Sequence, residues 1–196
     1  MGDPRLERWL ETLVATPGLT ALREPAAVRR VHLEESLAAL ELVRRYPGPI
    51  VDVGSGGGSP GIPLAAALPD REVTLLEANG RKCEFLERAA REFPNIWVVR
   101  GRAEEQETDR FGVAVARALA PPPVALEWCL PLVTPGGAAI LYIGPSADVA
   151  AVAHAAQLLA GAEPEVHPGL LVVEKVGPTP PGFPRRPGVA RKRPLA

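Results

Sequence analysis

The N-terminal part of the chain carries apolar positions at helical spacing. Within residues 4–15 they recur every three or four residues, which predicts an amphipathic helix with one apolar face. This face is formed by Leu6, Trp9, Leu10, Leu13 and Val14. Pro17-Gly18 ends the helix, and a second helical stretch is predicted from Pro25 to about Tyr46, before Pro47-Gly48-Pro49. Residues 1–48 are therefore expected to form a helical cap.

From residue 49 the pattern changes to short apolar runs that alternate with helical segments. The runs that predict buried strands are 49–53, 72–77, 95–100, 113–116 and 138–143. The helical segments between and after them are 61–68, 80–93, 121–133 and 146–161. This alternation predicts an α/β fold with βαβ crossovers and a mostly parallel sheet. The runs 163–167 and 170–175 are expected to add a pair of strands at one edge, which makes seven strands.

Length and composition are those of an ordinary folded protein. The 196 residues, of which 46% are hydrophobic and 23% charged, fit one domain with a buried core. Cys83 and Cys129 are too few for a disulfide framework or a metal cluster, so we expect a reducing, cytoplasmic setting and no metal. No signal segment is evident, and no apolar run is long enough for a membrane span. We expect a monomer with three regions: the cap (1–48), a core (49–176) and a Pro-rich basic tail (177–196).

Charge is segregated along the chain. The net charge is −1, yet residues 185–196 contain no acidic residue, so all 23 acidic residues lie before them. The basic residues of this tail are Arg185, Arg186, Arg191, Lys192 and Arg193. Prolines within it predict an extended segment that could bind the phosphates of RNA. The alternative is a solvated chain end.

A glycine-rich loop over residues 54–61 is the strongest candidate for a ligand site. Glycines between a buried strand and a helix let the backbone turn sharply and let a ligand approach main-chain N–H groups. Ser59 and Pro60 suit the N-cap and first position of the following helix, whose free N–H groups would then face the ligand. A purely structural turn is the alternative, but five glycines in eight residues are more than a turn requires.

The glycine spacing leaves two cofactors open. Gly56, Gly58 and Gly61 satisfy a dinucleotide pattern, whereas Gly54, Gly56 and Gly58 preceded by Asp52 suit the loop of S-adenosylmethionine enzymes. Glu77, at the end of the second predicted strand, could accept hydrogen bonds from the ribose hydroxyls of either cofactor.

The sequence resembles the RsmG (GidB) family of bacterial 16S rRNA guanine-N7 methyltransferases. The residues that carry the resemblance run through most of the chain in family order: Leu19-Thr20-Ala21, His32 with Ser36, VDVGSGGGSPGIPLA, TLLEANGRKCEFL, Arg102-Ala103-Glu104-Glu105, Phe111, Arg117-Ala118-Leu119, and VVEK followed by FPRRPGVARKRPL. The resemblance implies a Rossmann-like, S-adenosylmethionine-dependent methyltransferase fold, S-adenosylmethionine as cofactor and 16S rRNA of the small ribosomal subunit as partner.

The resemblance also implies roles for individual residues. It assigns cofactor binding to Asp52, Gly54, Ser55, Gly56, Gly58, Ser59, Glu77, Ala78, Asn79, Ala103, Glu104 and Arg117. Within this set, the 54–59 loop would hold the methionine part, Glu77 the ribose and Ala103-Glu104 the adenine. Arg117 would also face the substrate as the catalytic residue, and Arg81 and Lys82 would lie near the RNA. Alternatively, Glu104 caps a turn, and Arg81 and Lys82 are solvated surface charges.

Several positions depart from the family pattern. Ser59 stands where the family has a bulky apolar residue, Gly112 where it has Asp, Ile143 where it has Lys, and Gly18 where it has Asn. A relative that binds S-adenosylmethionine or RNA with weak turnover is therefore one alternative, and an NAD-dependent dehydrogenase is another. His32 is expected to be a hydrogen-bonded residue rather than a catalyst, and the three tryptophans are expected in the core.

Overall fold

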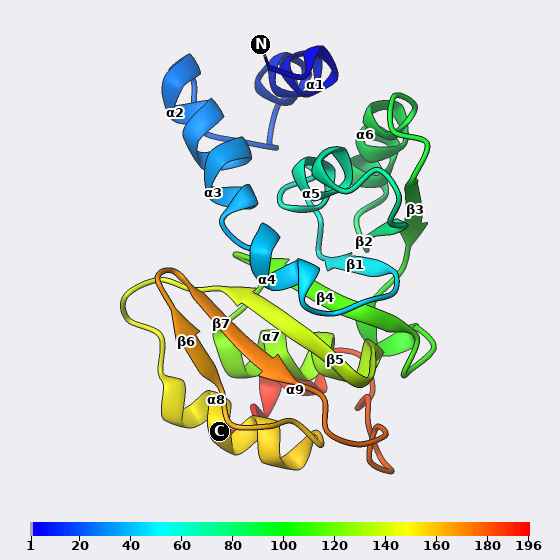
Figure 1. The fold of residues 1–196 in the computed structure, drawn as a ribbon, viewed down its shortest axis with the longest axis vertical. Coiled ribbons are helices and arrows are strands. Elements are labelled where there is room, and N and C mark those ends of the chain that lie inside the picture. Colours follow the sequence, from blue (N-terminus) through cyan, green and yellow to red (C-terminus); the bar gives the residue numbers. More distant parts are fainter. Residues whose placement is uncertain (1) are drawn as a thin grey trace.

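A seven-stranded sheet forms the centre of the computed structural model, which describes residues 2–196 (Figure 1). The strands lie in the order β3-β2-β1-β4-β5-β7-β6. Their bounds are β1 Ile50–Val53, β2 Val73–Glu77, β3 Ile96–Arg100, β4 Phe111–Arg117, β5 Val133–Tyr142, β6 Glu165–His167 and β7 Leu170–Glu174. The first five strands are parallel, and β7 pairs antiparallel with both β5 and β6. The predicted parallel sheet and terminal strand pair are confirmed.

Helices cover both faces of the sheet. The first face carries the cap together with α5 (Gly61–Ala67) and α6 (Gly80–Ala90), and side chains such as Leu13, Ile62 and Phe85 pack there. The second face carries α7 (Pro122–Cys129) and α8 (Val149–Leu158), which pack on residues such as Leu171. Adjacent strand residues alternate between the two cores, as strand geometry requires. No helix in residues 2–196 is both long and apolar enough to cross a membrane.

The cap begins with α1 (Pro4–Ala15), which has the predicted bounds. Residues 25–44 are almost entirely helical, as α2 (Pro25–Arg29), a π-helical turn η1 (Arg30–Glu34), α3 (Glu35–Leu37) and α4 (Leu40–Arg44). The second predicted helical stretch is therefore right in extent, but the π turn interrupts it. Such turns are frequent at functional sites.

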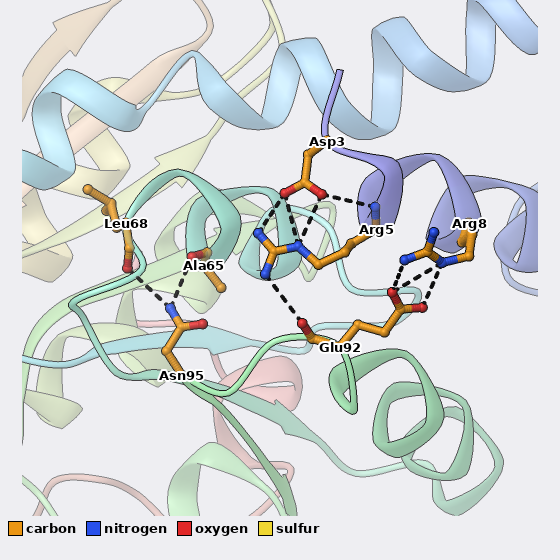
Figure 2. Close-up of polar contacts among 7 residues, drawn as sticks. All are labelled: Asp3, Arg5, Arg8, Ala65, Leu68, Glu92 and Asn95. Atoms are coloured by element: carbon orange, nitrogen blue, oxygen red, sulfur yellow. Dashed lines mark hydrogen bonds and ion pairs between the residues drawn. The ribbon is translucent and has the colours of Figure 1, made fainter. Parts of the chain in front are cut away.

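Polar contacts attach α1 to the core (Figure 2). The Arg8 guanidinium donates to the Glu92 carboxylate, and Arg5 Nη1 donates to the Glu92 carbonyl at 3.3 Å. Nearby, Asn95 Nδ2 donates to the carbonyl oxygens of Ala65 and Leu68, which fixes the loop after α5. The segments around α1, α5 and α6 are therefore held together at one end of the sheet.

A buried lysine anchors the segment after β7. Lys175 has no exposed surface, and its ammonium donates to Asp109 Oδ1 at 3.0 Å and Thr179 Oγ1 at 2.8 Å. The same ammonium donates to the carbonyl oxygens of Leu130 and Val133. A buried cation is tolerated when its hydrogen bonds are satisfied in this way.

The prediction of an extended basic tail is wrong. Residues 189–192 form a short helix, α9 (Val189–Lys192), and Arg185 makes an ion pair with Glu127 of α7. Glu127 is 2% exposed, so its carboxylate requires a charged partner. A partner for a buried carboxylate on another helix cannot be seen in the local pattern of prolines and arginines. Arg186, Arg191, Lys192 and Arg193 are exposed.

Within residues 2–196, no helix covers one face of β2 and β3. The connection from β3 to β4 contains only the short helix η2 (Ala103–Glu105), which leaves a hollow of about 390 Å³ lined by Thr74, Trp97 and Phe111. Trp97 is 60% exposed, so the prediction that it lies in the core is wrong. Trp9 and Trp128 are buried as predicted.

The glycine at position 112 has a packing explanation. A Cβ at Gly112 would lie 1.7 Å from the carbonyl oxygen of Pro47, so any side chain would displace the Pro47-Gly48 turn. Gly112 lies at the amino end of β4, whereas Arg117 ends the same strand. This departure from the family pattern is thus linked to the turn between the cap and the sheet.

We expect Gly112→Ala to destabilise the protein, because overpacking of this kind costs about 1–3 kcal/mol. For a chain of this length, each kcal/mol lowers Tm by roughly 2–4 °C. Thermal unfolding measures the change. Gly144→Ala is the matched control, since a Cβ at Gly144 has no heavy atom within 4 Å. An unchanged Tm for Gly112→Ala would contradict this explanation.

Candidate active site

The glycine loop that follows β1 uses left-handed backbone at three positions. Gly54, Gly56 and Gly58 have φ angles of 74°, 57° and 98°, which non-glycine residues rarely adopt. The loop remains close to the carboxyl end of the sheet, because Gly54 N and Ser55 N both donate to Leu76 O. The loop therefore presents backbone, rather than side chains, at this edge.

The other two glycines allow close packing. A Cβ at Gly57 would lie 2.4 Å from Leu13 Cδ1, and a Cβ at Gly61 would lie 2.7 Å from Asp52 Oδ2. The indole N–H of Trp9 donates to Gly57 O at 2.9 Å. All five glycines are thus required by backbone conformation or by contact, and the loop is packed between α1 and the sheet.

Ser59 does not cap the helix as predicted. The helix α5 begins at Gly61, Pro60 occupies the N-cap position, and no side chain accepts an N–H bond there. Instead, Ser59 Oγ lies 3.1 Å from Nδ1 of His32 and close to the His32 carbonyl. The serine is directed toward the cap, which the local N-cap pattern could not reveal.

His32 connects the cap, the glycine loop and β4. Its Nε2 lies 3.0 Å from Thr20 Oγ1, and its Nδ1 lies 3.4 Å from the guanidinium of Arg117. Burial lowers the pKa of His32, and the nearby Arg117 charge lowers it further, so the ring is neutral at pH 7. Because Arg117 can only donate, Nδ1 accepts and the proton lies on Nε2. The prediction that His32 is a hydrogen-bonded residue is confirmed.

Glu77 faces the loop from the end of β2. It is 8% exposed, and its Oε2 accepts from Gly56 N at 3.0 Å while Oε1 accepts from Asn79 N at 2.8 Å. Asn79 Oδ1 accepts from Lys82 N, so Asn79 is the N-cap of α6. Each oxygen of the Glu77 carboxylate retains a lone pair for a further donor.

A cleft of about 320 Å³ lies between the loop, Glu77 and η2. The predicted site residues that line it are Gly54, Glu77, Ala78, Lys82, Ala103, Glu104 and Arg191. Sequence reasoning missed the roles of Leu119, Trp128 and Gly188, which line the same cleft. Gly188 N donates to Glu104 Oε1 at 3.2 Å, and the Arg191 guanidinium lies 5.1 Å from the Trp128 ring centroid. The C-terminal segment is thus one wall of this cleft.

Arg117 lies in a second hollow, of about 430 Å³, between the cap and the ends of β4 and β5. It pairs in register with Tyr142, and its guanidinium carbon is 6.0 Å from the Tyr142 ring centroid. Its Nη1 donates to the Val31 carbonyl at 2.5 Å. Ala118, which follows Arg117, lines both the hollow and the cleft. The two spaces therefore meet at this residue.

The remaining predicted residues line neither space: Asp52, Ser55, Gly56, Gly58, Ser59, Asn79, Arg81, Arg185, Arg186, Lys192 and Arg193. Asp52 and Ser55 are buried beneath the loop, and Arg81 is exposed on α6. Asp52 Oδ2 accepts from Gly61 N at 3.0 Å, while Oδ1 has no hydrogen-bond partner among residues 2–196. Burial raises the pKa of Asp52 to about 7. Asp52 thus supports the loop from below.

The order of the strands and the position of the glycine loop are those of the Rossmann-like methyltransferase fold. A SAM-dependent O-methyltransferase from Thermotoga maritima is similar, with a TM-score of 0.61 and 16% identity over 85% of this chain and 71% of that chain. A 16S rRNA N2 G1207 methyltransferase from T. thermophilus, solved with AdoMet and guanosine, has a TM-score of 0.60 and 18% identity over 85% of this chain and 43% of that one.

The sequence specifies the family. The model of the family described as rRNA small subunit methyltransferase G matches residues 5–169. A Chloroflexus aggregans protein named Ribosomal RNA small subunit methyltransferase G is 35% identical over 97% of this chain and 89% of its own length. One of the same name from Salinispora arenicola is 43% identical over 80% of this chain and 70% of its length. The chain belongs to this family, so it is an rRNA methyltransferase rather than a dehydrogenase.

Asp52 gives the site a pH-dependent stability. Between about pH 4 and pH 7 the folded protein retains the Asp52 proton that the unfolded chain has lost, so this group's stabilising contribution declines as pH rises through that window. Asp52→Asn removes the titration. The unfolding free energy of the wild type relative to Asp52→Asn should therefore fall by up to about 1.4 kcal/mol per pH unit between pH 5 and pH 7. Denaturant unfolding measures it, and a pH-independent difference would contradict the assignment.

Proposed function

We propose that this protein transfers the methyl group of S-adenosylmethionine to N7 of a guanine in 16S rRNA. The observation that carries the proposal is the junction at Ala118, where the cleft beside the glycine loop meets the hollow that contains Arg117. A methyl donor in the cleft and a base in the hollow would face each other at this residue. The names of the relatives, which specify small-subunit rRNA methyltransferases, support the choice of RNA.

The donor set around the cleft fits S-adenosylmethionine. Glu77 supplies a carboxylate with free lone pairs for two ribose hydroxyls, and Ala78 and Asn79 would flank the ribose. A Cβ at Gly56 would meet only Gly54 O, at 3.8 Å, so the loop leaves space for the methionine part of the cofactor. A cleft of about 320 Å³ lies within the range of small-molecule sites.

Groups around and beneath the cleft complete this cofactor site. Ala103 and Glu104 would border the adenine, and the Gly188 N–H orients the Glu104 carboxylate. Asp52 and Ser55 act from below the loop: Asp52 holds Gly61, and Ser55 Oγ donates to Asp52 O at 2.8 Å. They position the backbone and do not contact the cofactor.

The chemistry requires alignment more than acid–base catalysis. S-adenosylmethionine supplies a methyl group on a sulfonium, whose carbon–sulfur electron pair returns to sulfur as N7 forms the new bond. The N7 lone pair is free in the plane of the base, so no general base has to remove a proton. Arg117, which is fixed by Val31 O and His32, provides guanidinium donors that would orient the base. Positioning of this kind can lower a barrier by roughly 7–11 kcal/mol.

The RNA would reach the site over a basic rim. Lys82, Arg102 and Arg191 line the cleft, and Arg81 is exposed next to Lys82. In the C-terminal segment, Arg186, Lys192 and Arg193 are exposed and available to phosphates, whereas Arg185 is engaged with Glu127. The target base has to leave its stack to enter the hollow, which favours an unpaired nucleotide.

Methyl transfer tests the proposed function directly. Purified protein is incubated with methyl-labelled S-adenosylmethionine and small-subunit RNA, as naked 16S rRNA and as assembled subunits, and the nucleosides are then separated. We expect labelled 7-methylguanosine. Absence of label with both substrates would indicate a binding relative without turnover, and label on an exocyclic nitrogen would contradict the N7 assignment.

Glu77→Ala tests the cofactor site. The change leaves two ribose hydroxyls without a charged acceptor, so we expect S-adenosylmethionine to bind roughly ten- to a hundredfold more weakly by calorimetry. Glu84→Ala is the matched control, because Glu84 is exposed on α6 and lines neither the cleft nor the hollow around Thr74. Equal affinity of the folded Glu77→Ala protein and the control would remove Glu77 from the site.

A further inference from the structure

We propose that Glu35 reads the Watson–Crick edge of the target guanine, accepting hydrogen bonds from its N1–H and N2–H groups. The inference rests on the proposed function and adds the residue that selects guanine over other bases. It is based on the hollow that contains Arg117, in which Glu35 is the only carboxylate among the lining residues.

The two walls of the hollow come from different parts of the fold. Arg117, Ala118 and Tyr142 belong to the carboxyl edge of the sheet, whereas Glu35 and Ala38 belong to the cap. The cofactor cleft opens at Ala118 on the sheet side. A guanine that directs N7 toward Ala118 therefore presents its opposite edge, which carries N1 and N2, to the cap.

The chemistry of that edge selects a carboxylate. Guanine presents two neighbouring donors there, and an ionised carboxylate is an acceptor with two oxygens. Adenine has the ring nitrogen N1, an acceptor, at the corresponding position. The N1 lone pair would face the carboxylate and repel it, and no hydrogen bond would form there. A flipped base is commonly recognised by hydrogen bonds to this edge.

The Glu35 carboxylate is accessible to a base. It accepts no hydrogen bond within residues 2–196, and its one ion pair there, with Arg30 Nη1 at 3.7 Å, joins two exposed side chains and is therefore weak. The side chain is 49% exposed, so an incoming base can reach it. Arg117, from the opposite wall, supplies a positive charge to the same hollow.

The backbone that carries Glu35 is fixed against the sheet. The hydroxyl of Tyr142 donates to the carbonyl oxygen of Ser36, the next residue, and Ser36 Oγ donates to His32 O at 2.8 Å. Tyr142 is at the end of β5 and lines the hollow itself. This attachment sets the distance between Glu35 and the sheet edge before any base enters, which is what a recognition site requires.

Inosine at the methylated position tests the contact, because it differs from guanosine only by the missing N2 amino group. For the wild type, we expect kcat/KM on the inosine RNA to be roughly tenfold or more below that on the guanosine RNA, as for loss of a hydrogen bond to a charged group. Glu35→Ala should lose at least this factor on guanosine RNA, because it loses the contacts to both N1–H and N2–H, and its guanosine-to-inosine ratio should fall to the ratio set by the intrinsic reactivity of N7. The comparison of ratios cancels the difference in intrinsic N7 reactivity.

Two controls make the result specific. Glu34→Ala changes the neighbouring exposed carboxylate, which does not line the hollow, and should retain the wild-type ratio. Binding of S-adenosylmethionine to Glu35→Ala should be unchanged by calorimetry. The Glu35 assignment fails by itself if Glu35→Ala retains the wild-type ratio, or if the wild type does not distinguish the two RNAs. If the wild type forms no 7-methylguanosine at all, the proposed function fails, and the inference fails with it.

Discussion

The contact between the cap and the glycine loop is the constraint on which the site depends. Gly57 has no Cβ, so Leu13 can pack against its backbone while Trp9 donates to its carbonyl oxygen. On the other side, Gly61 packs against Asp52 and its neighbours in the sheet. A side chain at Gly57 would push the loop away from α1, and a side chain at Gly61 would push it away from the sheet. The loop is therefore held from above and below, and its left-handed residues are fixed without a ligand.

The contact between the cap and the glycine loop also positions the cofactor cleft and the hollow that contains Arg117. The cap continues past Val31 and His32, which accept hydrogen bonds from Arg117, and reaches the end of β5 through Ser36 and Tyr142. Ala118 lies between the two spaces: the cleft bordered by Glu77 is on one side, and the hollow bordered by the cap is on the other. The cap thus forms the substrate side of the site as well as covering the core.

The local sequence patterns were sufficient to predict most of the helices and strands and their arrangement in the fold. Apolar runs predicted the parallel strands, and the helical stripe predicted α1 at its observed bounds. The loop and Glu77 were also predictable, because they follow strands whose carboxyl ends share one edge. Tertiary contacts determined the rest. Ser59 turns toward His32, Arg185 pairs with buried Glu127, and Trp97 is exposed because no helix among residues 2–196 covers its face of β2 and β3. None of these partners lies near its residue in sequence, and the hollow that contains Glu35 likewise joins distant segments.

Hydrogen–deuterium exchange with and without S-adenosylmethionine locates the cofactor on the fold. We expect the cofactor to slow exchange in residues 53–59, 76–79, 102–105 and 117–119, the segments that contain or adjoin residues lining the cleft. The hollow around Thr74 and Trp97, on the uncovered face of β2 and β3, is the competing site in this protein. Protection confined to residues 72–74 and 97–99, with the glycine loop unchanged, would contradict the account.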